Sequence, residues 1–145
     1  MKILILCTGN SCRSQMAQGW LQSFDARLEV HSAGTEPATQ VNPGAVKVMK
    51  EAGIDISRHA PKSVEVYRDL EWDYVITVCD EANESCPVFS GRVKKRLHMG
   101  FEDPSKVSGT DDFIKSEFIR VRDEIRQRFY ALYESEIKGK ATKPE

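Results

Sequence analysis

The sequence predicts one α/β domain with a four-stranded, open parallel sheet and helices on both faces. Short apolar runs alternate along the chain with stretches in which apolar residues recur every three or four positions, as in strands followed by amphipathic helices. A length of 145 residues with 40% hydrophobic content suits a single core. We therefore expect one domain over residues 1–137 and a polar C-terminal tail over residues 138–145.

The N-terminal part of the chain contains two predicted strands and two predicted helices. The continuous apolar run at residues 2–6 is typical of a strand buried on both faces. A helical spacing of apolar residues begins at Arg13, and residues 28–34 form the next predicted strand. Asn42 supplies the N-cap of a second helix, and Gly53 ends it.

The rest of the chain continues the alternation. Residues 64–71 are predicted to form a short helix of undecided type, and residues 73–79 form a strong third strand that ends in a cysteine. Residues 95–101 form a weaker fourth strand. A long helix closes the domain, because apolar residues recur there at helical spacing: Ile114, Phe118, Val121, Ile125, Phe129 and Leu132.

Charge and hydropathy exclude several partners. The 21 Lys and Arg residues balance 22 Asp and Glu residues, so no global field gathers nucleic acid or an acidic membrane surface. No apolar run approaches the roughly 20 residues of a membrane span, and we expect a cytoplasmic protein. In a reducing compartment, four cysteines indicate catalytic, redox or metal chemistry rather than structural disulfides.

The stretch CTGNSCRS, residues 7–14, is predicted to hold an oxyanion against a thiolate. It runs from a strand end into a helix N-terminus, where backbone N–H groups and the helix dipole favour an anion. Gly9 permits close approach or a positive φ, and Asn10 tolerates the left-handed region. This field is expected to lower the pKa of Cys7, and Arg13 offers a planar fork to two oxygens. Ser14 can donate its hydroxyl to the thiolate. The predicted oxyanion site is therefore Thr8, Gly9, Asn10, Ser11, Cys12, Arg13 and Ser14.

Cys7 and Cys79 both follow predicted strands. In open parallel sheets, ligands bind beyond the carboxyl ends of strands, at a switch in strand order. The two cysteines are therefore expected to share one crevice.

These motifs resemble a known family. The spacing of Cys7, Arg13 and Ser14 is the C-x5-R-S loop of the low-molecular-weight protein tyrosine phosphatase fold, and CTGNSCRSQMA is closer still to the thioredoxin-coupled arsenate reductases of that fold. NPGAVKVMKEAGIDIS, VITVCDEANESCP, the Asp103-Pro104 pair and FIRVRDEI also resemble those reductases. The resemblance covers most of residues 1–130.

The resemblance implies a reaction with arsenate as substrate and thioredoxin as reductant, without a cofactor. Cys7 is implied to attack arsenate, and Asp103 to protonate the departing oxygen. Cys79 then attacks Cys7, arsenite leaves, and Cys86 converts the first disulfide into Cys79–Cys86. Reducing As(V) to As(III) takes two electrons, which a pair of thiols supplies by forming a disulfide.

Other functions remain open at this point. A phosphatase needs only one nucleophilic cysteine and water, but Ser105 and Lys106 follow the Asp103-Pro104 pair where such phosphatases place an aromatic residue. This departure favours a small oxyanion over a phosphoprotein. A non-catalytic redox or oxyanion sensor is a third, more distant reading. Asp103 before proline is also a common turn signal, and its role as an acid rests mainly on the resemblance.

Metal sites have weaker support. Zinc bound by Cys7, Cys12, Cys79 and Cys86 is disfavoured because the gaps within each pair exceed the usual Cys-x2-4-Cys spacing. Gln18 and Lys62 stand where relatives that hold potassium carry acidic residues, so we predict no metal. Cys12 is interpreted as a packing residue.

The segment between Cys79 and Cys86 is predicted to change conformation with its redox state. DEANES contains good helix formers and begins with two acidic residues, which favours one to two helical turns in the dithiol form. A helix separates such positions by about 10 Å, whereas a disulfide requires Cα atoms within about 7 Å. Oxidation is therefore expected to unwind the segment and to expose the disulfide at the surface.

Overall fold

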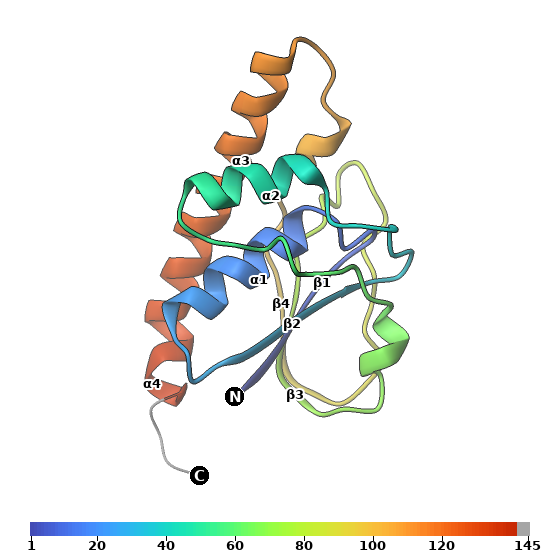
Figure 1. Cartoon of the computed structure of the whole chain (residues 1–145). Coiled ribbons are helices and arrows are strands. Elements are labelled where there is room, and N and C mark those ends of the chain that lie inside the picture. Colours follow the sequence, from blue (N-terminus) through green and yellow to red (C-terminus); the bar gives the residue numbers. More distant parts are fainter. Residues whose placement is uncertain (142–145) are drawn as a thin grey trace.

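Four parallel strands form the centre of the computed structural model, which describes residues 1–141 (Figure 1). Their order is β2-β1-β3-β4, with Leu6 of the central strand paired to Ala33 on one side and Thr77 on the other. The predicted open parallel sheet is confirmed. The strands are β1 (Lys2–Cys7), β2 (Glu29–Gly34), β3 (Trp72–Thr77) and β4 (Val93–His98).

The two faces of the sheet are covered unequally. The face that carries Ile3 and Ile5 packs against the three long helices, whose buried side chains join it in one cluster. The opposite face, with Leu4 and Leu6, is covered by the 3-10 helix η1 and by Phe89. The helices are α1 (Arg13–Phe24), α2 (Pro43–Glu51), η1 (Val64–Tyr67), η2 (Pro104–Lys106) and α3 (Asp111–Leu132).

Local signals for helix ends act as the sequence predicts. The side chain of Asn42 accepts a hydrogen bond from the N–H of Gly44 at 2.7 Å and caps α2. Gly53 follows the helix with φ of +89°, a conformation that glycine adopts without steric cost. The long helix α3 begins at the Thr110 cap. The middle of its apolar stripe is buried as expected, and the two ends, Ile114 and Leu132, are partly buried.

The C-terminal helix continues further than predicted. A π-helical turn, η3 (Tyr133–Ile137), joins α3 to α4 (Lys138–Ala141), and Lys140 donates to the Tyr74 hydroxyl at 2.8 Å. The start of the expected polar tail is therefore helical, and residues 142–145 of it lie outside the described residues.

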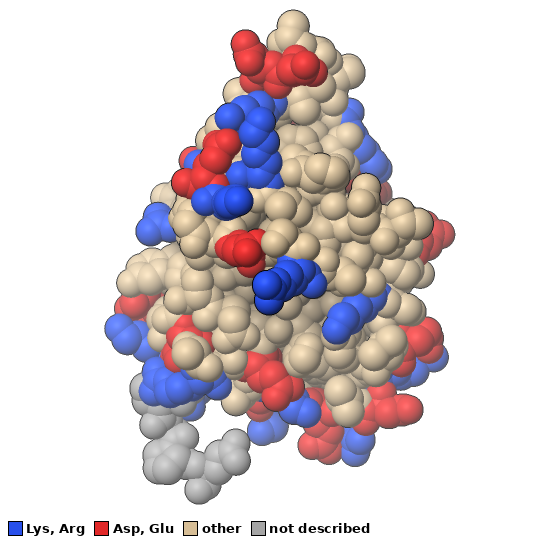
Figure 2. Space-filling view, viewed as in Figure 1, with Lys and Arg blue, Asp and Glu red and all other residues tan. Residues whose placement is uncertain are grey.

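Strands β3 and β4 end earlier than predicted. The ladder of β3 stops at Thr77, and Cys79 lies two residues beyond it. β4 begins at Val93 and ends at His98, because this edge strand is mostly exposed and its apolar pattern does not mark its bounds. Acidic and basic side chains are interspersed on the face that Figure 2 shows. No helix of residues 1–141 has the length and apolar character that a membrane crossing requires.

Candidate active site

The loop between β1 and α1 forms a cavity of about 420 Å³ at the carboxyl edge of the sheet. Three backbone N–H groups of residues 36–42, the segment between β2 and α2, donate to carbonyls of this loop. Glu36 donates to Thr8, Ala38 to Gly9 and Asn42 to Ser11, at 3.0, 2.9 and 2.8 Å. These bonds fix the loop against residues 36–42. The cavity is lined by Cys7, Thr8, Gly9, Asn10, Ser11, Cys12, Arg13, Glu36, Glu84, Ser85, Asp103 and Lys106.

The buried side chain of Asn10 links the loop by hydrogen bonds to neighbouring segments. The φ of Asn10 is +50°. The amide nitrogen donates to the hydroxyls of Ser14 and Ser32 at 2.7 and 2.9 Å. The amide oxygen accepts from the N–H of Lys62 at 2.9 Å and from Gln15 at 3.2 Å. The sequence predicted the tolerance of Asn10 for this backbone but not its hydrogen-bond partners, of which Ser32 and Lys62 come from distant segments.

Replacing Asn10 by alanine is expected to lower the free energy of unfolding by about 3 kcal/mol. The change leaves buried polar partners unpaired, and alanine tolerates a positive φ poorly. Urea unfolding measures the loss. Asn10→Gly, which removes the same hydrogen bonds but relieves the backbone, is expected to lose about 1 kcal/mol less. Equal stability of Asn10→Ala and the unaltered protein contradicts this role.

The glycine that the loop requires is Gly34, not Gly9. A Cβ atom at Gly34 would lie 2.3 Å from the carbonyl oxygen of Thr8, so a side chain there displaces the loop. At Gly9, a Cβ atom meets only the Ser11 hydroxyl at 3.7 Å, and Gly9 is not among the glycines with positive φ. The positive φ offered for Gly9 is therefore not found, and the close backbone approach occurs at Gly34 of the neighbouring strand β2, while the approach of an anion to Gly9 stays a prediction.

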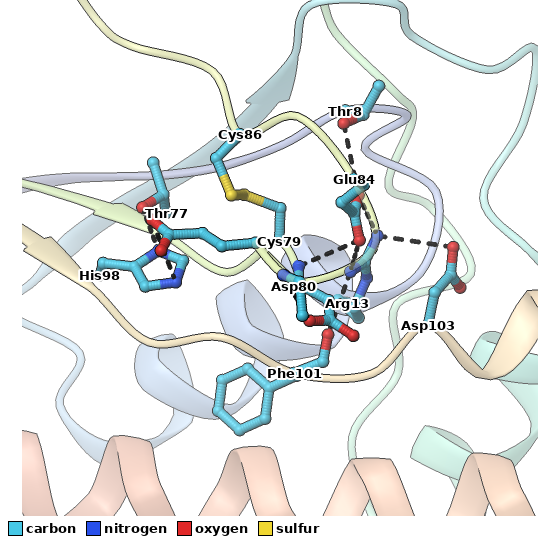
Figure 3. Close-up of a disulfide and its surroundings, with 12 residues drawn as sticks. Thr8, Arg13, Thr77, Cys79, Asp80, Glu84, Cys86, His98, Phe101 and Asp103 are labelled. Carbon is cyan, nitrogen blue, oxygen red and sulfur yellow. Dashed lines mark hydrogen bonds and ion pairs between the residues drawn. A yellow bond between two sulfur atoms is a disulfide. The ribbon is translucent and has the colours of Figure 1, made fainter.

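Arg13 reaches the cavity with its charge already paired (Figure 3). Its two terminal nitrogens donate to the two carboxylate oxygens of Glu84 at 2.5 and 3.0 Å. One of them also donates to the Phe101 carbonyl at 3.1 Å, and the other lies 3.5 Å from Asp103. Burial opposes the charge of Arg13, but these acidic partners outweigh it and raise the pKa of the guanidinium. The predicted fork is present, and Glu84 is a partner that the sequence analysis missed.

Asp103 also acts as the turn residue that the sequence allowed. Its Oδ1 atom accepts from the N–H and the hydroxyl of Ser105 at 3.0 and 2.6 Å and caps η2. Its Oδ2 atom faces Arg13, so the carboxyl group lines the cavity while it holds the turn.

The thiols of Cys7 and Cys12 are free and buried. Burial raises the pKa of Cys7; Arg13 opposes this effect, and the negative charges of Glu84 and Asp103 add to it. The expectation of a lowered pKa was wrong for this state, because burial of the thiol is the largest effect and the positive charge of Arg13, itself opposed by Glu84 and Asp103, does not outweigh it. Cys12 packs in the main core, and burial raises the pKa of its thiol as well.

The raised pKa of Cys7 predicts how its alkylation depends on pH. In the protein with an intact Cys79–Cys86 bond, Cys7 is protonated at neutral pH, and its thiolate fraction rises about tenfold per pH unit below the pKa. The rate with iodoacetamide should therefore climb from pH 7 to 9 without a plateau. Peptide mapping assigns the rate to Cys7. A rate that is already constant above pH 7 contradicts the raised pKa.

Cys79 and Cys86 are joined by a disulfide with their Cα atoms 5.7 Å apart. Cys79 is fully buried, and Cys86 is partly buried. Among residues 1–141, neither sulfur belongs to the lining of the Cys7 cavity, so the structure does not bring Cys79 into the crevice of Cys7. Cys79 has not moved to the surface as expected but remains buried in the core beside β3, and only the Cys86 end of the bond is partly exposed.

The segment inside the disulfide makes one tight turn. The N–H groups of Asn83 and Glu84 donate to the Asp80 carbonyl at 3.0 and 2.9 Å. His98 of β4 lies beside the disulfide, hydrogen-bonded to Thr77 at 2.7 Å (Figure 3). This state is the oxidised one, so the helix predicted for the dithiol form stays a prediction.

The open parallel sheet and the loop of Cys7 and Arg13 at its carboxyl edge, with the Asp103-Pro104 turn facing it, define a protein of the low-molecular-weight phosphatase type. The chain belongs to the low molecular weight phosphotyrosine protein phosphatase family, which it matches over residues 2–143.

Within this family, the chain is similar to arsenate reductases. It is 46% identical over 134 residues to the arsenate reductase of Halalkalibacterium halodurans, covering 92% of this chain and 95% of that protein. A solved arsenate reductase in the phosphate binding state superposes with a TM-score of 0.75 at 31% identity, over 90% of this chain and 95% of that one. A thioredoxin-dependent arsenate reductase of Corynebacterium glutamicum gives 0.67 at 27% identity, over 96% of this chain and 62% of that one.

Proposed function

We propose that this protein, an arsenate reductase by its similarity over most of its length, reduces arsenate through Cys7, Cys79 and Cys86 and is regenerated by thioredoxin. One observation carries the proposal. Free Cys7 faces the Arg13 cavity, while the other two cysteines are joined in the bond that such a cascade leaves at its end.

The electrons balance across three steps. The Cys7 thiolate bonds to arsenic, and an arsenate oxygen leaves after protonation. Cys79 then attacks the sulfur of Cys7, the S–As electron pair stays on arsenic, and As(III) departs as arsenite. Cys86 attacks Cys79 in the new disulfide, which frees Cys7 and forms Cys79–Cys86. Because Cys79 lies outside the cavity in the oxidised state, the segment that carries it must move during the cycle.

The loop residues take supporting roles in this proposal. Arg13 holds two oxygens of arsenate, and backbone N–H groups of the loop bind the others. Ser14 already accepts a hydrogen bond from Asn10, so its own hydroxyl hydrogen is available to the Cys7 thiolate in the dithiol state. A cytoplasmic location, where thioredoxin keeps thiols reduced, is part of the same proposal.

Asp103 is the proposed acid of the first step, and Asp103→Asn tests it. The amide cannot donate the proton that the departing oxygen requires, so single-turnover formation of arsenite is expected to slow by about 10²–10⁴-fold. Stopped-flow quenching with arsenite quantification measures the rate. Asn keeps the hydrogen bonds that cap η2, so a loss of folding does not account for the effect. An unchanged rate removes Asp103 from this role.

A coupled assay tests the proposed function. The reduced protein is mixed with arsenate, thioredoxin, thioredoxin reductase and NADPH, and steady NADPH oxidation that depends on arsenate and on thioredoxin is expected. Glutaredoxin with glutathione serves as the alternative reductant. If NADPH oxidation does not depend on arsenate while p-nitrophenyl phosphate is hydrolysed, the protein is instead a phosphatase that retains the shared loop.

A further inference from the structure

Glu84 binds Arg13 in the way an oxyanion is bound. Both carboxylate oxygens engage the guanidinium fork, at 2.5 and 3.0 Å, and the backbone N–H of Asp80 donates to one of them at 3.0 Å. The Thr8 hydroxyl lies 3.5 Å from the other. The Glu84 carboxylate lines the same cavity as Cys7 and takes both donors of the guanidinium fork, which are the donors that two oxygens of a tetrahedral anion need.

An oxyanion and the Glu84 carboxylate cannot share Arg13. Burial favours the neutral form of Glu84, but the hydrogen bonds from Arg13 and Asp80 outweigh burial and lower its pKa, so the group is ionised at neutral pH. A second anion in the cavity would find both donors of the buried Arg13 guanidinium already bonded to Glu84. It would also be repelled by the negative charges of Glu84 and Asp103. Binding of an oxyanion therefore requires Glu84 to leave.

The disulfide closes the short loop that carries Glu84. Glu84 lies between Cys79 and Cys86, whose Cα atoms the bond keeps 5.7 Å apart. The turn closes on itself, because the N–H of Glu84 donates to the Asp80 carbonyl while the N–H of Asp80 donates to the Glu84 carboxylate. A helix over the same segment would separate the two Cα atoms by about 10 Å and carry Glu84 elsewhere.

We propose that Glu84 is a further specificity-determining residue of the reductase: it takes the oxyanion's place on Arg13 while the Cys79–Cys86 disulfide exists and leaves when that disulfide is reduced. The oxidised enzyme thereby rejects arsenate and phosphate, and reduction opens the site. This inference rests on the proposed function only in taking the Cys7–Arg13 loop as the oxyanion site.

Because the two equilibria are linked, the proposal can be tested through the affinity for an oxyanion and through the reduction potential of the disulfide. If the dithiol form binds an oxyanion more tightly than the disulfide form, the oxyanion must favour the dithiol form by the same factor. A tenfold ratio of affinities corresponds to a rise of about 30 mV in the reduction potential of the disulfide at saturating oxyanion.

Titration with inorganic phosphate tests the proposal without arsenate or thioredoxin. Isothermal titration calorimetry on the disulfide form and on the dithiol form, prepared with a phosphine reductant, is expected to show at least tenfold weaker binding to the disulfide form. Glu84→Gln should bring the two affinities within about threefold, because a neutral amide neither neutralises Arg13 nor repels an anion. Glu81→Gln is the matched control. It removes a charge from the same turn, but Glu81 pairs with His98 instead of Arg13, so the ratio should persist.

A redox titration in dithiothreitol buffers gives the second readout, with alkylation and mass analysis reporting the Cys79–Cys86 bond. Saturating phosphate should raise the potential of the unaltered protein and of Glu81→Gln, and should leave that of Glu84→Gln nearly unchanged. Circular dichroism confirms that each variant is folded. Equal phosphate affinity in the two redox states of the unaltered protein overturns the proposal, as does a ratio that persists in Glu84→Gln. A functioning arsenate assay alongside such a result confines the failure to Glu84.

Discussion

Replacing Cys7 by serine is expected to lower arsenate turnover by about 10⁶-fold, the scale of loss when a covalent nucleophile is removed. The serine hydroxyl is a far weaker nucleophile at neutral pH and cannot enter a disulfide, so both the first bond to arsenic and the later exchange are lost. The thioredoxin-coupled NADPH assay measures the change. Near-normal turnover by Cys7→Ser would falsify the proposed function.

Two variants place that loss in context. Cys12→Ser makes the same exchange in the same loop, at another buried thiol, and measures what turnover loses when a cavity-lining thiol other than the nucleophile is changed. Its effect should be smaller by at least about 10³-fold. Arg13→Lys keeps the charge but removes the fork, and a loss of about 10²–10³-fold is expected. Urea midpoints show whether each variant is folded.

Replacing Cys86 by alanine is expected to stop the enzyme after one turnover. The first two steps do not involve Cys86, so about one equivalent of arsenite is released, and the protein is left with a Cys7–Cys79 disulfide in place of the Cys79–Cys86 bond of the structure. Cys79→Ala should stop earlier, before arsenite leaves. Arsenite quantification with disulfide mapping by mass spectrometry distinguishes the two stalled states.

The order of the cascade is tested by which disulfide accumulates first. Non-reducing peptide maps of the protein with all four cysteines, quenched during the first turnover, should contain Cys7–Cys79 before Cys79–Cys86. A Cys7–Cys86 linkage in that sample contradicts the order. Cys12→Ala is the control for scrambling, because Cys12 is buried in the core and takes no part in the proposed exchange.

The sequence predicts the parts of the site that are contiguous. The strand, the loop and the helix that carry Cys7 and Arg13 follow one another along the chain, so local patterns suffice to place them. Glu84 escaped prediction because it meets Arg13 from 71 positions away, and only the turn inside the disulfide directs its carboxylate there. The direction of the Cys7 pKa shift was wrong mainly because the thiol is buried by packing that the local pattern does not show, and Glu84 adds to the rise.

Packing between segments accounts for the other differences. The need for glycine at position 34 arises where β2 passes behind the loop, which no local pattern records. The ends of β4 were missed because an exposed edge strand has few apolar residues to mark it. In contrast, α2 and α3 matched closely, since capping residues and a 3.6-residue period are local signals.

The hydrogen bonds of Asn10 have a consequence for folding. The loop of residues 7–14 is one continuous stretch of sequence, but its conformation depends on hydrogen bonds of Asn10 to Ser32, 22 positions away, and to the backbone of Lys62, 52 positions away. The oxyanion loop is therefore tied to the sheet, and the amide proton of Lys62, which Asn10 binds, should exchange only when the loop and this segment separate. An intermediate that has formed β1 and α1 but has not yet docked β2 carries the complete motif and still has no site.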